Sequence, residues 1–120
     1  MAVSDRVAAV MRQKLCEPLS LGDLAATAGL SRTHFAAAFR RATGVPPLRF
    51  FHRLKIARAC ELLETGGMPV SRVAAAVGYR DYRYFDRMFR RVVGQTPRDY
   101  RRGNCGWSGL GADSPAALGA

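Results

Sequence analysis

Arginine side chains recur on two short segments of this chain, about fifty residues apart, at positions that a helix would turn toward solvent. They are Arg32, Arg40, Arg41, Arg83, Arg87, Arg90 and Arg91. A guanidinium group presents its hydrogens as a planar fork that matches the paired acceptors of a phosphate or of a guanine edge. The chemistry that these residues favour is therefore recognition of a polyanion.

The composition favours the same kind of partner. Lysine and arginine together number 19 against 9 acidic residues, which gives a net charge of +10 and a sequence pI near 10.8. All but two of these cations are arginine. Such a balance predicts binding to a nucleic acid rather than to an acidic small substrate.

The residues that catalysis would need are not found in the sequence. No nucleophile lies beside a base, no two acids are paired, and no phosphate-binding glycine loop occurs. His34 and His52 have no partner at metal-ligand spacing. The cysteines Cys16, Cys60 and Cys105 also lack that spacing. We therefore expect no enzyme, no metal site and no cofactor.

The arginine-bearing segments belong to an internal repeat. Residues 24–30 align with 73–79 at an offset of 49, and residues 31–50 align with 81–100 at an offset of 50. The matched pairs are Ala25/Ala74, Ala26/Ala75, Gly29/Gly78, Phe35/Phe85, Phe39/Phe89, Arg40/Arg90, Arg41/Arg91, Gly44/Gly94 and Pro47/Pro97. Because apolar, glycine and arginine positions repeat together, each copy must bury the same face and present the same charge. The repeat predicts two helix-turn-helix units.

Apolar periodicity predicts an all-α fold of about seven helices without a strand. Ser4, Ser20 and Ser31 are expected to cap the first three helices, with a capping box between Ser20 and Asp23. Gly29 supplies the turn of the first unit. The inner face of the third helix is expected to be Phe35, Ala38, Phe39 and Ala42.

A longer helix from about residue 48 to 64 carries apolar residues on several sides, which is typical of a helix packed between two neighbours. The predicted arrangement is a DNA-binding domain over residues 1–102, with homeodomain-like lobes at 1–45 and 67–102 and a linker helix within 46–66. A short seventh helix is expected from Pro97 to Tyr100. Residues 103–120 are rich in glycine, alanine and serine, so we expect a mobile tail.

The second helix of a helix-turn-helix unit enters the major groove, and its outward residues near the N-terminus reach base edges. The candidate base-contacting residues are Arg32, Thr33, Ala36 and Ala37 in the first unit and Tyr82, Arg83, Asp86 and Arg87 in the second. The candidate phosphate-contacting residues are Arg40, Arg41, Arg90 and Arg91. An ion pair between Asp86 and Arg90 is an equal alternative to base contact by Asp86. Since alanines can only touch a thymine methyl, the second unit is expected to carry most of the hydrogen-bonded discrimination.

Several motifs together resemble the AraC/XylS family of bacterial transcription regulators. In the second unit they are Gly78-Tyr79, Phe85, Arg87, Phe89-Arg90-Arg91, Gly94, Thr96-Pro97 and Tyr100-Arg101; in the first they are Leu24-Ala25, Gly29-Leu30-Ser31, Phe35, Phe39-Arg40-Arg41 and Gly44. The resemblance covers roughly residues 4 to 102. It implies two helix-turn-helix lobes bridged by a long helix, with both recognition helices in successive major-groove segments on one face of DNA.

The resemblance places the family's base-reading positions at Thr33, Ala36 and Ala37 and at Tyr82, Arg83, Asp86 and Arg87. It also implies an activator. Many family members carry a separate effector-binding or dimerisation domain. We expect none within these 120 residues, and two alternatives stay open: a stand-alone activator of the short type, or the DNA-binding part of a larger protein.

The function expected from the sequence is that of a sequence-specific regulator of transcription that binds double-stranded DNA. Two alternatives remain: a largely non-specific architectural DNA binder, and a protein-interaction module that docks on RNA polymerase or another regulator. No apolar run approaches the roughly twenty residues that cross a bilayer, and no signal peptide is recognisable. We therefore expect a cytoplasmic, nucleoid-associated protein without a membrane partner.

Overall fold

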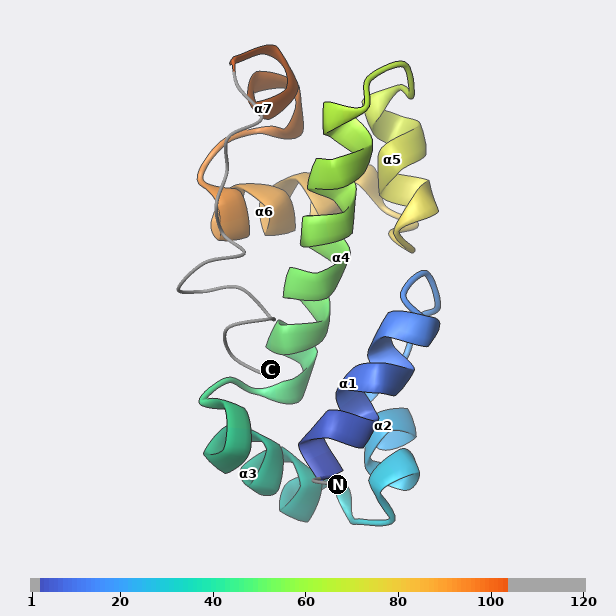
Figure 1. The fold of residues 1–120 in the computed structure, drawn as a ribbon, viewed down its shortest axis with the longest axis vertical. Helices are drawn as coiled ribbons and strands as arrows, with labels where there is room; N and C mark the ends of the chain where they lie inside the picture. The colour runs from blue at the N-terminus through green and yellow to red at the C-terminus, as the bar shows by residue number, and fades with distance from the viewer. Residues whose placement is uncertain (1–2, 104–120) are drawn as a thin grey trace.

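The computed structural model describes residues 3–103, and this part of the chain forms seven helices and no strand (Figure 1). The helices are α1 (Val3–Gln13), α2 (Leu21–Ala28), α3 (Arg32–Thr43), α4 (Pro47–Glu64), α5 (Val70–Ala76), α6 (Tyr82–Val93) and α7 (Pro97–Gly103). The long helix α4 forms the axis, with α1 to α3 around one end and α5 to α7 around the other (Figure 1). The all-α prediction is confirmed.

Local hydrogen bonds explain where the first helices start and stop. At α2, the Asp23 backbone N donates to Ser20 Oγ at 3.1 Å and the Ser20 backbone N donates to Asp23 Oδ2 at 2.9 Å, which is the predicted capping box. Ser31 caps α3 by accepting from the His34 backbone N at 3.2 Å. Gly29 ends α2 with a φ of 72°, the left-handed backbone that glycine adopts without strain.

Two of the expected helix ends were wrong. Ser4 does not cap α1, because the helix already includes Val3. Helix α7 continues three residues past Tyr100 to Gly103, because no glycine or proline interrupts the two arginines that follow the tyrosine. Apart from Gly103, the expected mobile tail lies outside the described residues.

Each end of the molecule has its own hydrophobic core, and α4 contributes to both. The core of the first lobe consists of Val7, Ala8, Met11, Leu24, Ala25, Phe35, Phe39, Val45, Phe50 and Phe51. The core of the second lobe consists of Ile56, Ala59, Cys60, Leu63, Val73, Ala74, Val77, Tyr79, Phe85, Phe89 and Tyr100. The first core therefore ends on α4 at Phe51, and the second begins at Ile56. As predicted, α4 is packed between neighbours.

The repeat in sequence is also a repeat in burial. From Ser31 to Arg40 and from Asp81 to Arg90, buried, half-buried and exposed residues follow one another in the same order. Helices α3 and α6 each have 12 residues and end at a glycine in the left-handed region. Both units therefore bury one face and present another in the same way.

The inner face of α3 differs from the prediction at its C-terminal end. Ala42 is exposed and Ala38 is only half-buried, whereas Thr43 is buried. The Thr43 hydroxyl donates to the Phe39 carbonyl at 2.9 Å and accepts from the Val45 backbone N at 3.2 Å. Because its polar group is satisfied within the turn, a threonine can be buried there at little cost.

A single lysine joins the two lobes. Lys55 lies on α4 between the two cores and is 4% exposed. Its Nζ donates to the carbonyls of Leu15 and Glu17, in the connection between α1 and α2, and to the carbonyl of Val77 at the end of α5. The ring of Phe51 lies 4.4 Å from the ammonium. Carbonyls from both lobes thus converge on one buried cation.

The backbones of the two lobes also approach each other directly beside Lys55. Gly78 has a φ of 92°, and a Cβ at this position would lie 2.6 Å from Lys55 Nζ and 2.7 Å from the Cys16 carbonyl oxygen. Cβ atoms in proteins essentially never lie this close to another heavy atom, so a side chain here would clash. The junction therefore requires glycine for space as well as for backbone conformation.

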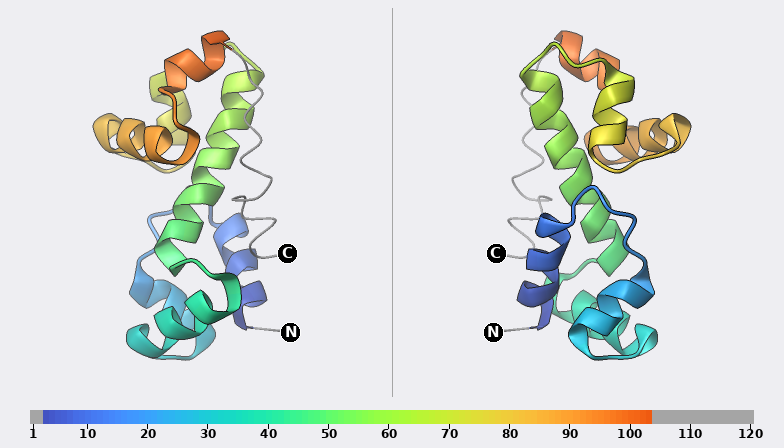
Figure 2. Two further views of the ribbon diagram at one scale, coloured as in Figure 1. Left: turned by 90° about the vertical axis from the view of Figure 1, so that its left-hand side faces the viewer. Right: turned by 90° about the vertical axis from the view of Figure 1, so that its right-hand side faces the viewer.

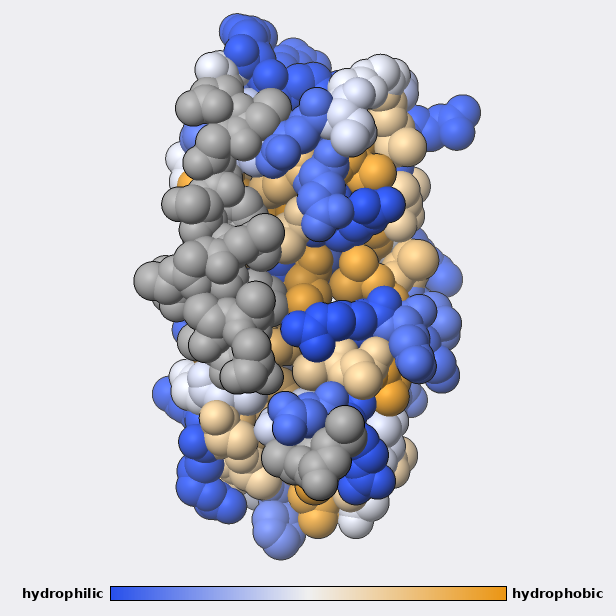
Figure 3. Space-filling model, viewed as in Figure 1, coloured by the Kyte–Doolittle hydropathy of each residue, from blue (hydrophilic) through white to orange (hydrophobic). Residues whose placement is uncertain are grey.

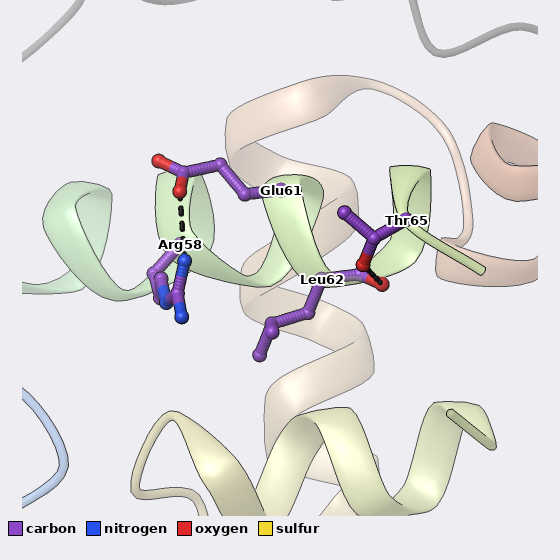
Figure 4. Close-up of polar contacts among 4 residues, drawn as sticks. All are labelled: Arg58, Glu61, Leu62 and Thr65. Carbon is purple, nitrogen blue, oxygen red and sulfur yellow. Dashed lines mark hydrogen bonds and ion pairs between the residues drawn. The ribbon is translucent and has the colours of Figure 1, made fainter. Parts of the chain in front are cut away.

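The far end of α4 is held by side chains of its own lobe. The Thr65 hydroxyl donates to the Leu62 carbonyl at 3.0 Å, and Arg58 forms an exposed ion pair with Glu61 at 2.9 Å (Figure 4). Tyr100 of α7 donates to Glu64 through its hydroxyl. The first two contacts lie at the end of α4 itself, and the bond from Tyr100 fastens α7 to it.

On the face shown in Figure 3, apolar surface is visible in the middle of the molecule, hydrophilic residues dominate the upper end, and hydrophilic and apolar residues are mixed at the lower end. None of the helices between residues 3 and 103 is long and apolar enough to cross a bilayer.

Gly78 and Gly94 have similar backbone conformations. The close approach at Gly78 predicts that replacing it by alanine lowers the free energy of unfolding more than the same change at Gly94. Gly94→Ala should cost about 1–2 kcal/mol in the free energy of unfolding, the cost of a left-handed residue, because a Cβ there meets nothing within 4 Å. Gly78→Ala should cost about 1–3 kcal/mol more, because its Cβ also forces the lobes apart. Urea unfolding of both variants measures the difference, and equal losses would contradict the packing argument.

Candidate nucleic-acid interface

Helices α3 and α6 occupy equivalent places at the two ends of α4. Both cross the direction of α4, and both run the same way from N-terminus to C-terminus (Figure 1). The side views place α6 on the side of α4 away from α1, and the α2–α3 unit reaches toward that same side (Figure 2). The two predicted recognition helices are therefore not turned to opposite sides of the molecule.

The outward face of α6 is rich in hydrogen-bond donors. Arg83, Arg87, Arg90 and Arg91 are all exposed, and Tyr82 is 42% exposed. Phe85 and Phe89 fill the opposite face and are fully buried. The buried phenylalanines thus fix the helix while its guanidinium groups remain available to acceptors.

Asp86 and Arg90 form the intrahelical ion pair that the sequence left as an alternative. Arg90 Nη2 lies 3.0 Å from Asp86 Oδ2, and the Asp86 side chain is 25% exposed. A partly exposed pair within one helix, as here, contributes little to stability. Base contact by Asp86 and phosphate contact by Arg90 stay predictions, and each would have to compete with this pair.

The outward face of α3 is smaller and less polar. Thr33 and Ala37 are exposed, and Ala36 is half-buried. Arg32 is exposed, but its Nε lies 3.4 Å from the place that a Cβ on Gly22 would occupy. The Arg32 side chain therefore lies against the start of α2, and reaching a base would require it to leave that position.

The late arginines of α3 are placed like their counterparts on α6. Arg40 and Arg41 are exposed in the last turn of the helix. Arg90 and Arg91 hold the same places on α6. Cations at a helix C-terminus also complement the helix dipole, so phosphate contact by these four residues stays a prediction.

His52 links α4 to the start of α6, a role that sequence reasoning missed. Its Nδ1 lies 2.7 Å from the Tyr79 hydroxyl, and its Nε2 lies 3.3 Å from the Tyr84 hydroxyl. Arg87 in turn lies 5.8 Å from the centre of the Tyr84 ring. The partners stand 27 and 32 residues away from His52 in the chain, so no local spacing could have revealed them. Tyr79 is buried in this cluster, whereas the Tyr84 side chain is 38% exposed.

The environment of this cluster shifts the pKa of its members. Burial lowers the pKa of His52 below its ordinary value of 6.5, and the nearby Lys55 ammonium lowers it further. Burial also raises the pKa of the Tyr79 hydroxyl. His52 is thus held as a neutral ring, which can donate through one nitrogen and accept through the other.

A cleft of about 330 Å³ opens between the lobes beside this cluster. It is lined by side chains of the α1–α2 connection, of α4 and of the start of α6, including Leu19, Leu48 and Tyr84. Among residues 3–103, no group of three or more histidine, cysteine or acidic side chains could hold a metal ion. The cleft offers apolar surface and aromatic hydroxyls.

A family model described as a helix-turn-helix domain matches residues 24–103. The chain is 43% identical over 98 residues to the MmsAB operon regulatory protein of Pseudomonas aeruginosa, an alignment that covers 82% of this chain and 32% of that protein. It is 31% identical over 97 residues to the HTH-type transcriptional regulator GbdR of the same species, covering 81% of this chain and 26% of that one. The chain therefore spans about a third or less of the curated relatives it matches.

The fold of this chain is similar to those of several solved structures. The DNA-binding domain of the global transcriptional factor AdpA, crystallised with a target DNA, superposes with a TM-score of 0.79 at 34% identity, covering 84% of this chain and 91% of that one. A regulator with an AraC-type DNA-binding domain from Chromobacterium violaceum gives a TM-score of 0.75 at 25% identity, covering 84% and 93%.

The lowered pKa of His52 predicts a pH-dependent part of the stability. As pH falls from about 8 to about 5.5, the unfolded chain takes up a proton on this residue before the folded protein does, so the free energy of unfolding decreases with decreasing pH. His52→Gln should lose this part of the pH dependence. His34→Gln, at an exposed position of α3, is the matched control and should retain it. Urea unfolding across the pH range would contradict the assignment if both variants kept the pH slope of the wild type.

Proposed function

Since the chain belongs to the AraC/XylS family of helix-turn-helix DNA-binding transcription regulators, we propose that it reads one DNA duplex at two successive major-groove segments. Helix α3 enters one segment, and α6 enters the next. The observation that carries the proposal is the arrangement of the two helices, which lie parallel at the two ends of α4 and run in the same direction (Figure 1).

The dimensions of the molecule support this arrangement. The long axis of the protein measures 42 Å, whereas successive major-groove segments on one face of B-DNA lie about 34–36 Å apart. Helix α4, with 18 residues, is about 27 Å long at 1.5 Å per residue. One molecule is therefore long enough to meet two groove segments without a second copy.

The two recognition helices are proposed to divide the work. Arg83 and Arg87 of α6 can grip the O6 and N7 acceptors of guanine, and Tyr82 and Asp86 lie beside them. On α3, Ala36 and Ala37 can only touch thymine methyl groups, which leaves Thr33 and Arg32 as hydrogen-bonding readers. The late arginines Arg40, Arg41, Arg90 and Arg91 contact phosphates and fix the register. The operator is therefore asymmetric.

The biological setting follows the family. We propose that the regulator is an activator that works at the bacterial nucleoid in the cytoplasm, with RNA polymerase as a further partner and without a cofactor. The division into a first lobe (1–45), a linker helix (46–66) and a second lobe (67–102) is proposed to be a functional one, with one groove segment for each lobe.

Selection of bound fragments from a random duplex library tests the proposal. Sequence-specific binding predicts a bipartite, asymmetric consensus. A duplex with this consensus should stay bound to the protein when excess genomic DNA is added at near-physiological salt. Loss of every fragment to that competitor would instead indicate the architectural binder. Capture of RNA polymerase without any salt-dependent affinity for DNA would indicate the protein-interaction module.

The division of work predicts two kinds of variant. Arg83→Ala or Arg87→Ala should weaken binding to the selected duplex by about 1–3 kcal/mol and relax base preference in the segment that α6 reads, because each change removes a guanidinium fork from base edges. Arg41→Ala should weaken all duplexes alike and reduce the slope of log affinity against log salt by about one, because it removes a phosphate contact.

Fluorescence anisotropy on the selected duplex and on a scrambled duplex, each at several salt concentrations, measures both effects. Equal losses on the two duplexes for all three variants would overturn the assignment of base and phosphate contacts.

A further inference from the structure

Lys55 lies on α4 between the two hydrophobic cores, which share no buried residue. The first core ends on α4 at Phe51 and the second begins at Ile56. Between them, the Lys55 ammonium binds the Leu15 and Glu17 carbonyls of the first lobe and the Val77 carbonyl of the second. No carboxylate among residues 3–103 forms an ion pair with it. The carbonyl oxygens and the flanking aromatic rings are what compensates its charge.

This arrangement fixes how the lobes are turned about α4. A buried ammonium loses free energy when one of its acceptors moves away and no other acceptor takes its place. Leu15, Glu17 and Val77 lie 40, 38 and 22 residues from Lys55 in the chain and belong to both lobes, so twisting one lobe against the other breaks at least one of these bonds. Beside Lys55, the space between Gly78 and the Cys16 carbonyl is too small for an added Cβ, so the two lobes approach closely there.

We propose that Lys55 is a positioning residue that sets the spacing between the two DNA segments which the protein can read at once. The inference rests on the proposed two-segment reading, and it concerns the linkage between the lobes rather than their contacts with bases. Helices α3 and α6 each keep their own fold without Lys55, because each is packed in its own core. What Lys55 adds to the shared helix α4 is a second link between the lobes, which limits how far they can turn about that helix.

The consequence for DNA follows from the geometry of the duplex. One extra base pair between the two segments moves the second by about 3.4 Å along the axis and turns it by about 34°. A rigid protein cannot follow this change and keeps only one lobe engaged, so the advantage of linked binding is lost. A protein with freely hinged lobes would follow it with little loss.

The experiment compares wild type and Lys55→Met on the duplex that the wild type selects and on derivatives with one base pair inserted or deleted between the segments. Wild type should bind the altered duplexes at least about tenfold more weakly. Lys55→Met should bind the selected duplex several-fold more weakly and should lose less than about threefold on altering the spacing. A variant that was merely unstable would lose affinity equally at every spacing, so the spacing profile separates the two causes.

Arg58→Met is the matched control, because Arg58 lies on the same helix, is exposed and pairs only with Glu61 among the described residues (Figure 4). It should keep the wild-type spacing profile. Replacing a buried charge by an apolar side chain is often tolerated, and circular dichroism checks that Lys55→Met is folded. If it is not folded, Gly78→Ala disturbs the same junction from the other lobe and should broaden the profile in the same way.

The outcomes separate the inference from the proposed function. If the library yields no bipartite duplex, two-segment reading fails. If it yields one but the folded Lys55 or Gly78 variant keeps a spacing profile as sharp as that of the wild type, the role of Lys55 is overturned. A broadened profile in that variant, with an unchanged profile in Arg58→Met, supports it.

Discussion

The structure depends on a polar junction in the middle of α4. The two cores are built on the same helix, α4, and where one core ends and the next begins the lobes are also linked by a buried charge. Lys55 is nearly inaccessible to water, and burial lowers the pKa of its ammonium. The carbonyls that receive it lie in the connection between α1 and α2 and directly after the end of α5. The junction therefore links a loop of the first lobe to a helix end of the second.

Around that junction, the repeat provides two scaffolds of the same design with different outer surfaces. The same order of burial along α3 and α6 shows that each unit uses the same inward positions. The residue types at the outward positions can therefore differ between the two units, because those side chains are not needed to pack the core. This explains how arginines gather on α6 while alanines occupy the matching places on α3. A family can change the DNA that it reads without changing its fold.

The sequence predicted those features that depend on local or repeated patterns. The capping box at Ser20, the cap at Ser31 and the helix-ending glycines follow from short-range geometry, and the number of helices follows from periodicity. The base and phosphate contacts stay predictions, because no DNA is present to test them. What could not be predicted is the set of contacts between distant segments.

Lys55 and His52 both occur in a helix with apolar residues on several sides, where either could have faced solvent. One signal was available for the lysine: it is one of two in a chain whose other strong cations are all arginine. The error at Ala42 and Thr43 has a different cause. Periodicity assigns faces by residue type, and a threonine that satisfies its hydroxyl within its own turn can be buried in place of an alanine.

The order of the two cores along the chain has a consequence for synthesis on the ribosome. All buried members of the first core have been translated once Phe51 is made, and the second core begins only at Ile56. No buried residue of the first core comes after Phe51 in the chain. The N-terminal lobe can therefore fold while the C-terminal lobe is still inside the ribosomal exit tunnel. Lys55 can donate to the Val77 carbonyl only after Val77 has left the ribosome. The two lobes are therefore joined late in synthesis.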